Sequence, residues 1–354
     1  MRSAFLLFLV AAELSTQFST QLSAQAPPEP AALLKQYVHL RDDDLEKVNA
    51  GRVMVKRLET HDSSEVAIFG IARIGVSLDF FLEKYRDIKT FKKDPAVLRI
   101  GRFSDPPRAS DLDSLTLPPE EVEALKSCVA GNCKVKLSEQ MIERFRREVD
   151  WNSSDSAAQA ARLMHSVLVD YVNAYLAGGN AAMILYDDKK TPAQLDEEFH
   201  GLLEGSPYLR EYAPAFYDYL AQNPRDKIPG VETFLYWSEE KLGPLKPVLT
   251  VTQISIYRRS SRGQDWCFIA SKQIYASHYF DGSLGLAILT GEHAETAKPA
   301  IWMMYFNRSR VDGFTGLLGG LKRALAVSRA LSGMGQNIEA VRKRLEAKFQ
   351  RMRG

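Results

Sequence analysis

The chain has 354 residues, of which 45% are hydrophobic and 25% are charged. These are ordinary values for a globular protein, so they exclude wholesale disorder and leave room for one large core or two modest ones. A net charge of +2 gives no basis for a nucleic-acid-binding function. Residues 322–354 nevertheless carry nine basic and two acidic side chains, a local charge of +7.

The first 26 residues have the pattern of an export signal. Arg2 provides a positive start, residues 4–12 are an apolar stretch, and residues 24–26 (Ala-Gln-Ala) match a cleavage site. The apolar stretch is too short to span a bilayer, which takes about 20 residues, and no later stretch is long and apolar enough. We therefore expect a mature protein that is periplasmic or secreted, the alternative being a retained N-terminal helix.

Three cysteines fit an oxidising compartment. Cys128 and Cys133 flank Val-Ala-Gly-Asn, which favours a turn, so we predict a disulfide between them, with free thiols as the alternative. A metal site would need two further ligands, and no histidine is close to this pair in the sequence. Cys267 remains, and we expect it to be a small buried residue. The sequence predicts no metal and no cofactor.

The N-terminal part, residues 27–117, alternates strands and helices. Two runs rich in β-branched residues are separated by a polar turn and predict a hairpin, and Ser77 is placed to cap the helix that follows. The expected elements are a helix at 31–37, strands at 51–58 and 65–74, a helix at 78–85 and a strand at 97–103.

Residues 118–230 change to helical periodicity, with apolar residues three and four positions apart. Pro118 and Pro119, followed by acidic residues, favour a helix start. The expected helices lie at 118–125, 137–149, 157–176, 191–203 and 213–220. We interpret this region as a helical insertion between two β-rich parts of one sheet.

Residues 231–354 return to strands and end in a long helix. The expected strands lie at 233–237, 248–257, 266–280, 283–290 and 301–306. The final helical pattern has an apolar stripe that we expect to face the sheet, and Gly333 and Gly335 are expected to kink or split it. The stripe comprises Leu317, Leu321, Leu325, Leu331, Met334, Ile338, Val341, Leu345, Phe349 and Met352.

The familiar catalytic and phosphate-binding motifs are absent from the sequence. The glycine-rich run 313–320 precedes an apolar helix and lacks the Lys-Ser/Thr of a P-loop. Close packing of a helix start on the sheet therefore explains this run better than phosphate binding.

The strand predicted at 266–280 holds the first candidate ligand-binding residues. Alternation puts Lys272 and His278 on one face, which is otherwise apolar, and Tyr275 on the other. A charge that faces a core needs a partner, so the two side chains either hydrogen-bond within the core or line a ligand cavity. They lie roughly 20 Å apart along a strand, which argues against a joint catalytic role.

Arg308, Arg310 and Asp312 lie on one side of the last strand. One interpretation is an Arg/Asp network that holds the corner between this strand and the final helix. The other is an arginine clamp at a cavity mouth, suited to a carboxylate or phosphate head group.

The order of elements over 66–103 and 266–349 resembles the helix-grip fold of START-type and Bet v 1-like lipid-binding domains. This resemblance implies a sheet and a long C-terminal helix that enclose an apolar ligand, and the helical insertion departs from it. The whole chain also resembles an exported bacterial family of no assigned activity. The segments that carry this second resemblance are 125–128, 131–133, 271–280 and 308–313.

We therefore expect an α+β fold, an antiparallel sheet closed by a long C-terminal helix, in an exported protein that holds an apolar or lipid-like small molecule. The expected ligand-binding residues are Lys272, Tyr275, His278, Arg308 and Arg310. One alternative is a hydrolase or cyclase on the same scaffold, with His278 or Tyr275 as acid–base. Another is docking on a partner or an anionic membrane through the basic face of the last helix. That face comprises Arg342, Lys343, Arg344, Lys348 and Arg351.

Overall fold

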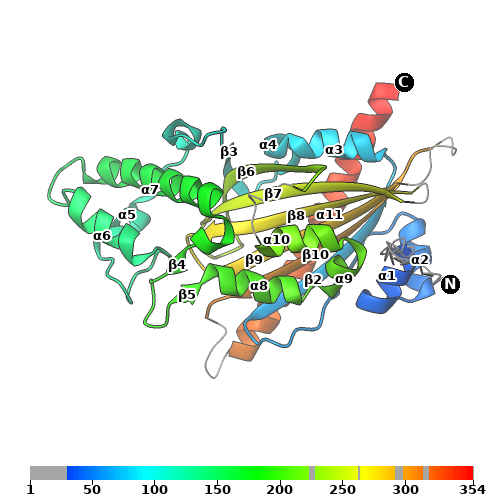
Figure 1. Ribbon diagram of the computed structural model, residues 1–354, viewed down its shortest axis with the longest axis horizontal. Helices are drawn as coiled ribbons and strands as arrows, with labels where there is room; N and C mark the ends of the chain where they lie inside the picture. Colours follow the sequence, from blue (N-terminus) through cyan, green and yellow to red (C-terminus); the bar gives the residue numbers. More distant parts are fainter. Residues whose placement is uncertain (1–29, 223–227, 262–263, 292–297, 314–318, 354) are drawn as a thin grey trace, which may run out of the picture.

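The computed structural model describes residues 30–222, 228–261, 264–291, 298–313 and 319–353. The predicted export signal lies outside these residues, and so does most of the glycine-rich run 313–320. The described part is an α+β protein, as expected, in which one large antiparallel sheet carries helices on both faces (Figure 1).

Eight strands form the sheet in the order β1-β2-β10-β9-β8-β7-β6-β3, each antiparallel to its neighbours. Their bounds are β1 Met54–Arg57, β2 Glu65–Ile74, β3 Val97–Arg102, β6 Val231–Glu240, β7 Val248–Ser261, β8 Gln264–Ala276, β9 Phe280–Gly291 and β10 Ile301–Val311. The pairing of β1 with β2 confirms the hairpin predicted within 51–74. β10, the last strand, inserts between this hairpin and the strands of the C-terminal half.

Short helices precede the sheet. α1 (Pro30–Leu33) continues into the π-helical turn η1 (Leu34–Val38), which confirms the helix predicted at 31–37, and α2 (Asp42–Asn49) follows. The apolar pattern does not reveal α2, because Val48 is its one buried side chain. Three acidic residues in its first turn favour this helix through its dipole.

One face of the sheet is covered by α3 (Leu78–Arg86), α4 (Ile88–Phe91) and α11 (Gly319–Arg353). Ser77 caps α3 as predicted, because its hydroxyl accepts a hydrogen bond from the Phe80 amide. α11 packs on β1 and β2, where a Cβ atom at Gly70 would clash with Ile338 and Met334. A glycine at this position therefore lets α11 approach the sheet closely.

α11 is one continuous helix of 35 residues, so the kink or split predicted at Gly333 and Gly335 is wrong. A glycine inside a helix costs about 1 kcal/mol relative to alanine. Buried side chains on the same stretch, such as Met334 and Ile338, hold the helix against the sheet and offset this cost.

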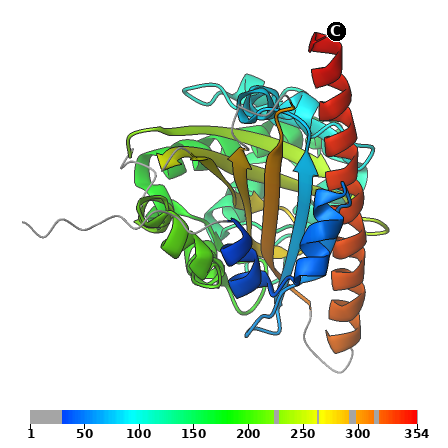
Figure 2. The same cartoon turned by 90° about the vertical axis from the view of Figure 1, so that its right-hand side faces the viewer.

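The apolar stripe predicted for the last helix is buried only in its central part. Leu321, Leu325 and Met352 are exposed, because α11 extends beyond the strands at both ends (Figure 2). The members of the stripe that are buried are Met334, Ile338, Val341 and Leu345.

The region interpreted as an insertion contributes elements to the opposite side of the sheet, some over the sheet face and some beyond one end of the strands (Figure 1). These elements are η2 (Ala109–Leu112), α5 (Pro119–Lys126), α6 (Glu139–Glu148), α7 (Ser156–Gly178), η3 (Gly179–Ala182), β4 (Leu185–Tyr186), β5 (Ala193–Gln194), α8 (Leu195–Glu204), α9 (Pro207–Tyr212) and α10 (Pro214–Gln222). In Figure 1, α8, α9 and α10 lie in front of the sheet and α11 lies behind it. Both faces of the central strands are therefore covered, which explains the apolar residues at successive positions of 266–270.

A β-bulge interrupts the alternation of β8. Val251 pairs with Tyr275 and Thr252 with Gln273, so Ile274 is the extra residue of the bulge. As a result, Ile274 and Tyr275 both belong to the core on the insertion side.

β8 ends at Ala276, earlier than the strand predicted at 266–280. Residues 277–279 form a bend in which Tyr279 has a left-handed backbone with φ of 62°. His278 lies beyond the end of β8, so it does not share one strand with Lys272 as predicted, although both side chains contact elements of residues 118–230.

Candidate functional site

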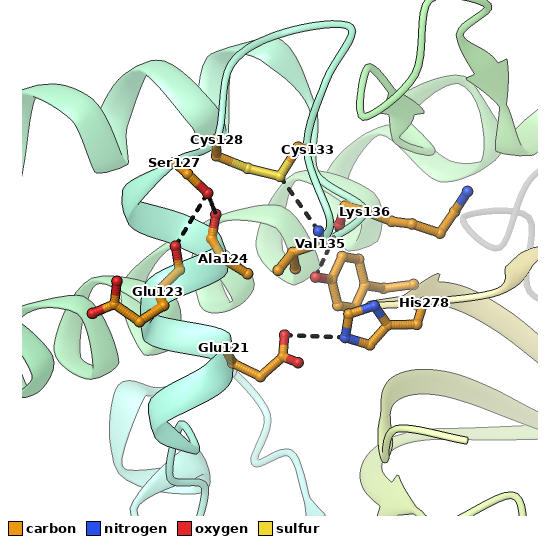
Figure 3. The surroundings of a disulfide bond; sticks show 10 residues. Glu121, Glu123, Ala124, Ser127, Cys128, Cys133, Val135, Lys136 and His278 are labelled. Atoms are coloured by element: carbon orange, nitrogen blue, oxygen red, sulfur yellow. Dashed lines mark hydrogen bonds and ion pairs between the residues drawn. A yellow bond between two sulfur atoms is a disulfide. The ribbon is translucent and has the colours of Figure 1, made fainter. Parts of the chain in front are cut away.

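The predicted disulfide between Cys128 and Cys133 is present at the end of α5 (Figure 3). The segment that leaves it is bonded to the end of β8. The Lys136 amide donates to the Ser277 carbonyl over 2.8 Å, and the Lys136 carbonyl accepts from the Tyr275 hydroxyl over 3.1 Å. The disulfide therefore lies in a segment that ties α5 to the sheet.

His278 faces Glu121 of α5 from the bend after β8 (Figure 3). Its Nε2 atom lies 3.0 Å from one carboxylate oxygen of Glu121, and Lys246 Nζ lies 2.9 Å from the other. Burial acts to raise the pKa of Glu121, but His278 and Lys246 outweigh burial and the pKa is lowered. The His278 side chain is thus buried and paired.

The space beside His278 is small. A recess of about 30 Å³ is lined by apolar residues and by the polar residues Thr116, Glu121, Glu239, Ser277 and His278. A buried water needs at least 10–15 Å³ of such space, so this recess has room for about two waters.

Tyr275 is also enclosed. Burial raises the pKa of its hydroxyl, and the Glu121 carboxylate raises the pKa further. The hydroxyl therefore stays protonated at neutral pH and serves as the hydrogen-bond donor to Lys136.

Lys272 lies between β8 and the insertion, not on the α11 side. Its Nζ donates to Asn180 Oδ1 over 2.5 Å and lies 4.5 Å from the centroid of the Phe199 ring. Burial lowers the pKa of Lys272 to about 7, although the negative charge of Asp196 acts to raise it. Lys272 is therefore paired within the core, with Asn180 and the ring of Phe199.

Arg308 and Arg310 lie side by side on β10 and face α8 of the insertion. Arg308 pairs with Glu65, and Arg310 Nη1 lies 2.6 Å from a carboxylate oxygen of Glu198. Asp312 lies beyond the strand and pairs with two lysines. The two arginines are therefore neutralised by carboxylates of the same chain, and they lie on the opposite side of the sheet from α11.

A polar group that the sequence prediction did not include lies on the α11 side. We call it the inner polar cluster, and its members are Tyr85, Lys92, Tyr236, Glu240, Ser271 and Tyr305. Lys92 Nζ lies 2.6 Å from a Glu240 carboxylate oxygen and 3.2 Å from the Tyr236 hydroxyl. The Tyr85 hydroxyl lies 3.4 Å from Ser271 Oγ. Tyr85 and Lys92 come from the α3–α4 region, and the other members come from the sheet.

The ionisation of the inner polar cluster follows from its depth. Burial acts to lower the pKa of Lys92, but the neighbouring Tyr236 and Glu240 outweigh burial and the pKa is raised. Burial acts to raise the pKa of Glu240, and Lys92 reverses this. Burial raises the pKa values of Tyr85 and Tyr305. At neutral pH the cluster therefore holds one ion pair and protonated Tyr85 and Tyr305.

The inner polar cluster is deep but not sealed. The Lys92 and Glu240 side chains are 28% and 26% exposed, and Tyr85, Ser271 and Tyr305 are also partly exposed.

On the insertion side of the same central strands, Lys272, Leu286 and Phe306 are buried. Solvent thus reaches the α11 side of the central strands, although α3 and α11 lie on that face.

Two sequence signals point to this cluster. Polar Ser271 lies on the face of β8 opposite Lys272, and Gly285 interrupts a strand, which indicates the close approach of another group. That group is Tyr305, whose hydroxyl would lie 2.7 Å from a Cβ atom at Gly285.

A second hollow lies outside the sheet, beside its edge strand β1. It has a volume of about 350 Å³ and opens between β1 and the start of α2. It is lined by His39, Leu40, Arg41, Asp44, Met54, Val55, Lys56 and Phe69.

Within the part of the chain that the structure describes, no group of three or more His, Cys, Asp or Glu side chains is arranged to hold a metal ion. In the same residues, no helix has the length and apolar character needed to cross a membrane. The sequence matches no model of a known protein family and no curated protein sequence.

Proposed function

We propose that this is an exported binding protein that holds an apolar small molecule between the sheet and the helices α3, α4 and α11. The observation that carries the proposal is the partial exposure of Ser271, Ala287 and Tyr305, three residues at the centre of a sheet covered by helices on both faces. Side chains at such positions are normally buried. A space that water or a ligand can enter explains their exposure.

The surroundings of this space suit an apolar molecule with a polar end. The wall on the α11 side includes buried apolar residues of five strands, namely Phe234, Ile254, Ile256, Ile269, Leu289 and Met303. The inner polar cluster lies among them. Ligand sites are typically apolar with a few convergent polar groups, and this arrangement has that composition.

Export is supported by two features of different kinds. The N-terminal sequence has the pattern of a signal, and the Cys128–Cys133 disulfide is a bond that persists in oxidising compartments. The location we propose is therefore the periplasm or the cell exterior.

The experiment that tests the binding function uses the neutral apolar dye Nile red, whose fluorescence increases in an apolar site. Ala287→Phe places a ring in the proposed space, so we expect the dye affinity to fall at least fivefold. The matched control is Ala347→Phe, at an exposed position of α11, which should leave the affinity unchanged. Native mass spectrometry of the purified protein would identify any retained ligand.

Two outcomes would contradict the proposed position of the ligand. One is a folded Ala287→Phe variant that binds the dye as the wild type does. The other is a loss of binding caused instead by Met54→Trp, which would place the dye in the hollow beside β1.

A second candidate function, docking on an anionic membrane, is favoured by the first turns of α11. Leu321 and Leu325 are 61% and 51% exposed and lie one turn apart. Lys322 and Arg329 are exposed nearby, and no acidic residue occurs in α11 before Glu339. Apolar side chains among basic ones suit the surface of an anionic bilayer.

The basic face expected to make this contact lies further along α11 and is partly engaged within the protein. Arg342 Nη2 lies 2.8 Å from a carboxylate oxygen of Glu339, and Arg344 donates to the carbonyls of Phe91 and Lys93. The start of α11 is therefore the better candidate for membrane contact.

A further inference from the structure

We infer that the ion pair between Lys92 and Glu240 selects a neutral ligand, an apolar molecule with a hydroxyl or carbonyl oxygen, over a carboxylate of the same size. This inference rests on the proposed function and adds the chemical class of the ligand. It is drawn from the composition and geometry of the inner polar cluster.

The charge of the cluster is balanced before any ligand enters. Lys92 Nζ lies 2.6 Å from Glu240, and the two side chains are similarly exposed, at 28% and 26%. Glu240 also accepts a hydrogen bond from the Ser238 hydroxyl over 2.7 Å. The ammonium group of Lys92, which would attract a carboxylate ligand, is already neutralised by Glu240. The Glu240 carboxylate itself would repel such a ligand. Repulsion between like charges is strong in such a partly desolvated place.

The remaining polar groups suit a neutral oxygen. Tyr85, Tyr236 and Tyr305 each carry a hydroxyl that can donate or accept one hydrogen bond. Lys92 has three N–H donors and uses two of them on Glu240 and Tyr236. A hydroxyl or carbonyl group can therefore be bonded here without separating the ion pair.

The wider charge distribution agrees with this assignment. The cationic groups predicted to bind an anionic head, Arg308 and Arg310, lie on the opposite side of the sheet and are paired with Glu65 and Glu198. They add no positive charge to the space beside the inner polar cluster.

The test compares 1-decanol with decanoate, two probes of equal chain length, by isothermal titration at pH 8. We expect the full-length wild type to bind decanol at least tenfold more tightly than decanoate. Glu240→Gln leaves the ammonium of Lys92 without its counter-charge, so the ratio of the two affinities should shift toward decanoate by at least tenfold.

The matched control is Glu239→Gln. Glu239 is the neighbouring residue of β6 but faces the other way, and its carboxylate is paired with Arg99 over 2.7 Å. Its substitution removes an equivalent ion pair and should leave the ratio unchanged. A shift common to both variants would indicate a general effect of charge and would overturn the inference.

A reciprocal variant covers the case in which Glu240→Gln does not fold. Lys92→Gln leaves the Glu240 carboxylate without its partner, so decanoate binding should weaken further while decanol still binds. Thermal unfolding of each variant establishes that it is folded.

The outcomes separate the selectivity from the binding function itself. A wild type that prefers decanoate, or folded variants with an unchanged ratio, would overturn the assigned ligand class. A wild type that binds neither probe nor Nile red would instead count against the binding function.

Discussion

The ring of Tyr305 on β10 lies across Gly285 on β9, so that a single methyl group added to the glycine would meet the tyrosine hydroxyl at 2.7 Å. This relationship directs the hydroxyl toward β8, where Ser271 of the inner polar cluster pairs with Gly285. We predict that Gly285→Ala displaces the ring and lowers the free energy of unfolding by about 1–3 kcal/mol, the usual cost of overpacking.

Urea unfolding measures this change, and Nile red binding should weaken in the same variant. Gly291→Ala is the matched control, because nothing lies within 4 Å of a Cβ atom at that position. Equal stabilities of the two variants would show that Tyr305 adapts to the added methyl group.

Lys272 should make stability depend on pH. Burial lowers its folded-state pKa to about 7, from 10.5. Above pH 7 the unfolded chain therefore holds a proton that the folded chain does not, and stability rises with pH, by at most about 1.4 kcal/mol per unit. The Cys267 thiol, whose pKa burial raises to about 12 from 9.0, acts in the opposite direction above about pH 9.

The measurement is therefore urea unfolding of the wild type and Lys272→Met between pH 7 and 8.5. The variant lacks the titrating group, so its stability should rise less with pH than that of the wild type. Parallel curves for the two proteins would mean that Lys272 remains charged in the folded state.

The disulfide should leave one free thiol. Cys267 is buried and free, while Cys128 and Cys133 are bridged, so alkylation of the denatured, unreduced protein should label Cys267 alone. A double Cys128→Ser, Cys133→Ser variant should lose about 2 kcal/mol of stability, as expected for a short loop. Labelling of three thiols in the exported protein would rule out the bridge.

The exposed leucines at the start of α11 should bind anionic membranes. We predict that Leu321→Ser with Leu325→Ser reduces sedimentation with phosphatidylglycerol vesicles at least threefold. Leu98→Ser with Leu245→Ser is the control, because these leucines are also exposed, at 47% and 42%, but lie elsewhere on the protein. Moderate salt should weaken binding, since exposed charges are screened beyond about 10 Å at about 0.1 M. Equal binding of both double variants would exclude this surface.

Local signals in the sequence determined most of the elements. The β-branched run at 65–74 coincides with β2, and the Ser77 cap followed by apolar residues coincides with α3. Such patterns depend on neighbours within one or two turns, so a single sequence contains them. The turn between Cys128 and Cys133 belongs to the same class, because both partners of the bridge lie in one short loop.

The tertiary structure alone decided which face of β8 belongs to which core. Lys272 and Ser271 occupy opposite faces in any strand, but both faces are covered, so alternation cannot say which one faces α11. The bulge at Ile274 and the bend before His278 then separate residues that a straight strand would align. The inner polar cluster contains Tyr85 of α3 and Tyr305 of β10, which are 220 residues apart in the sequence. They come together because β10 pairs with β2 and β9 and because α3 packs on the resulting sheet. Contacts between segments so far apart form only in the completed sheet, so the local periodicity of the sequence cannot predict them.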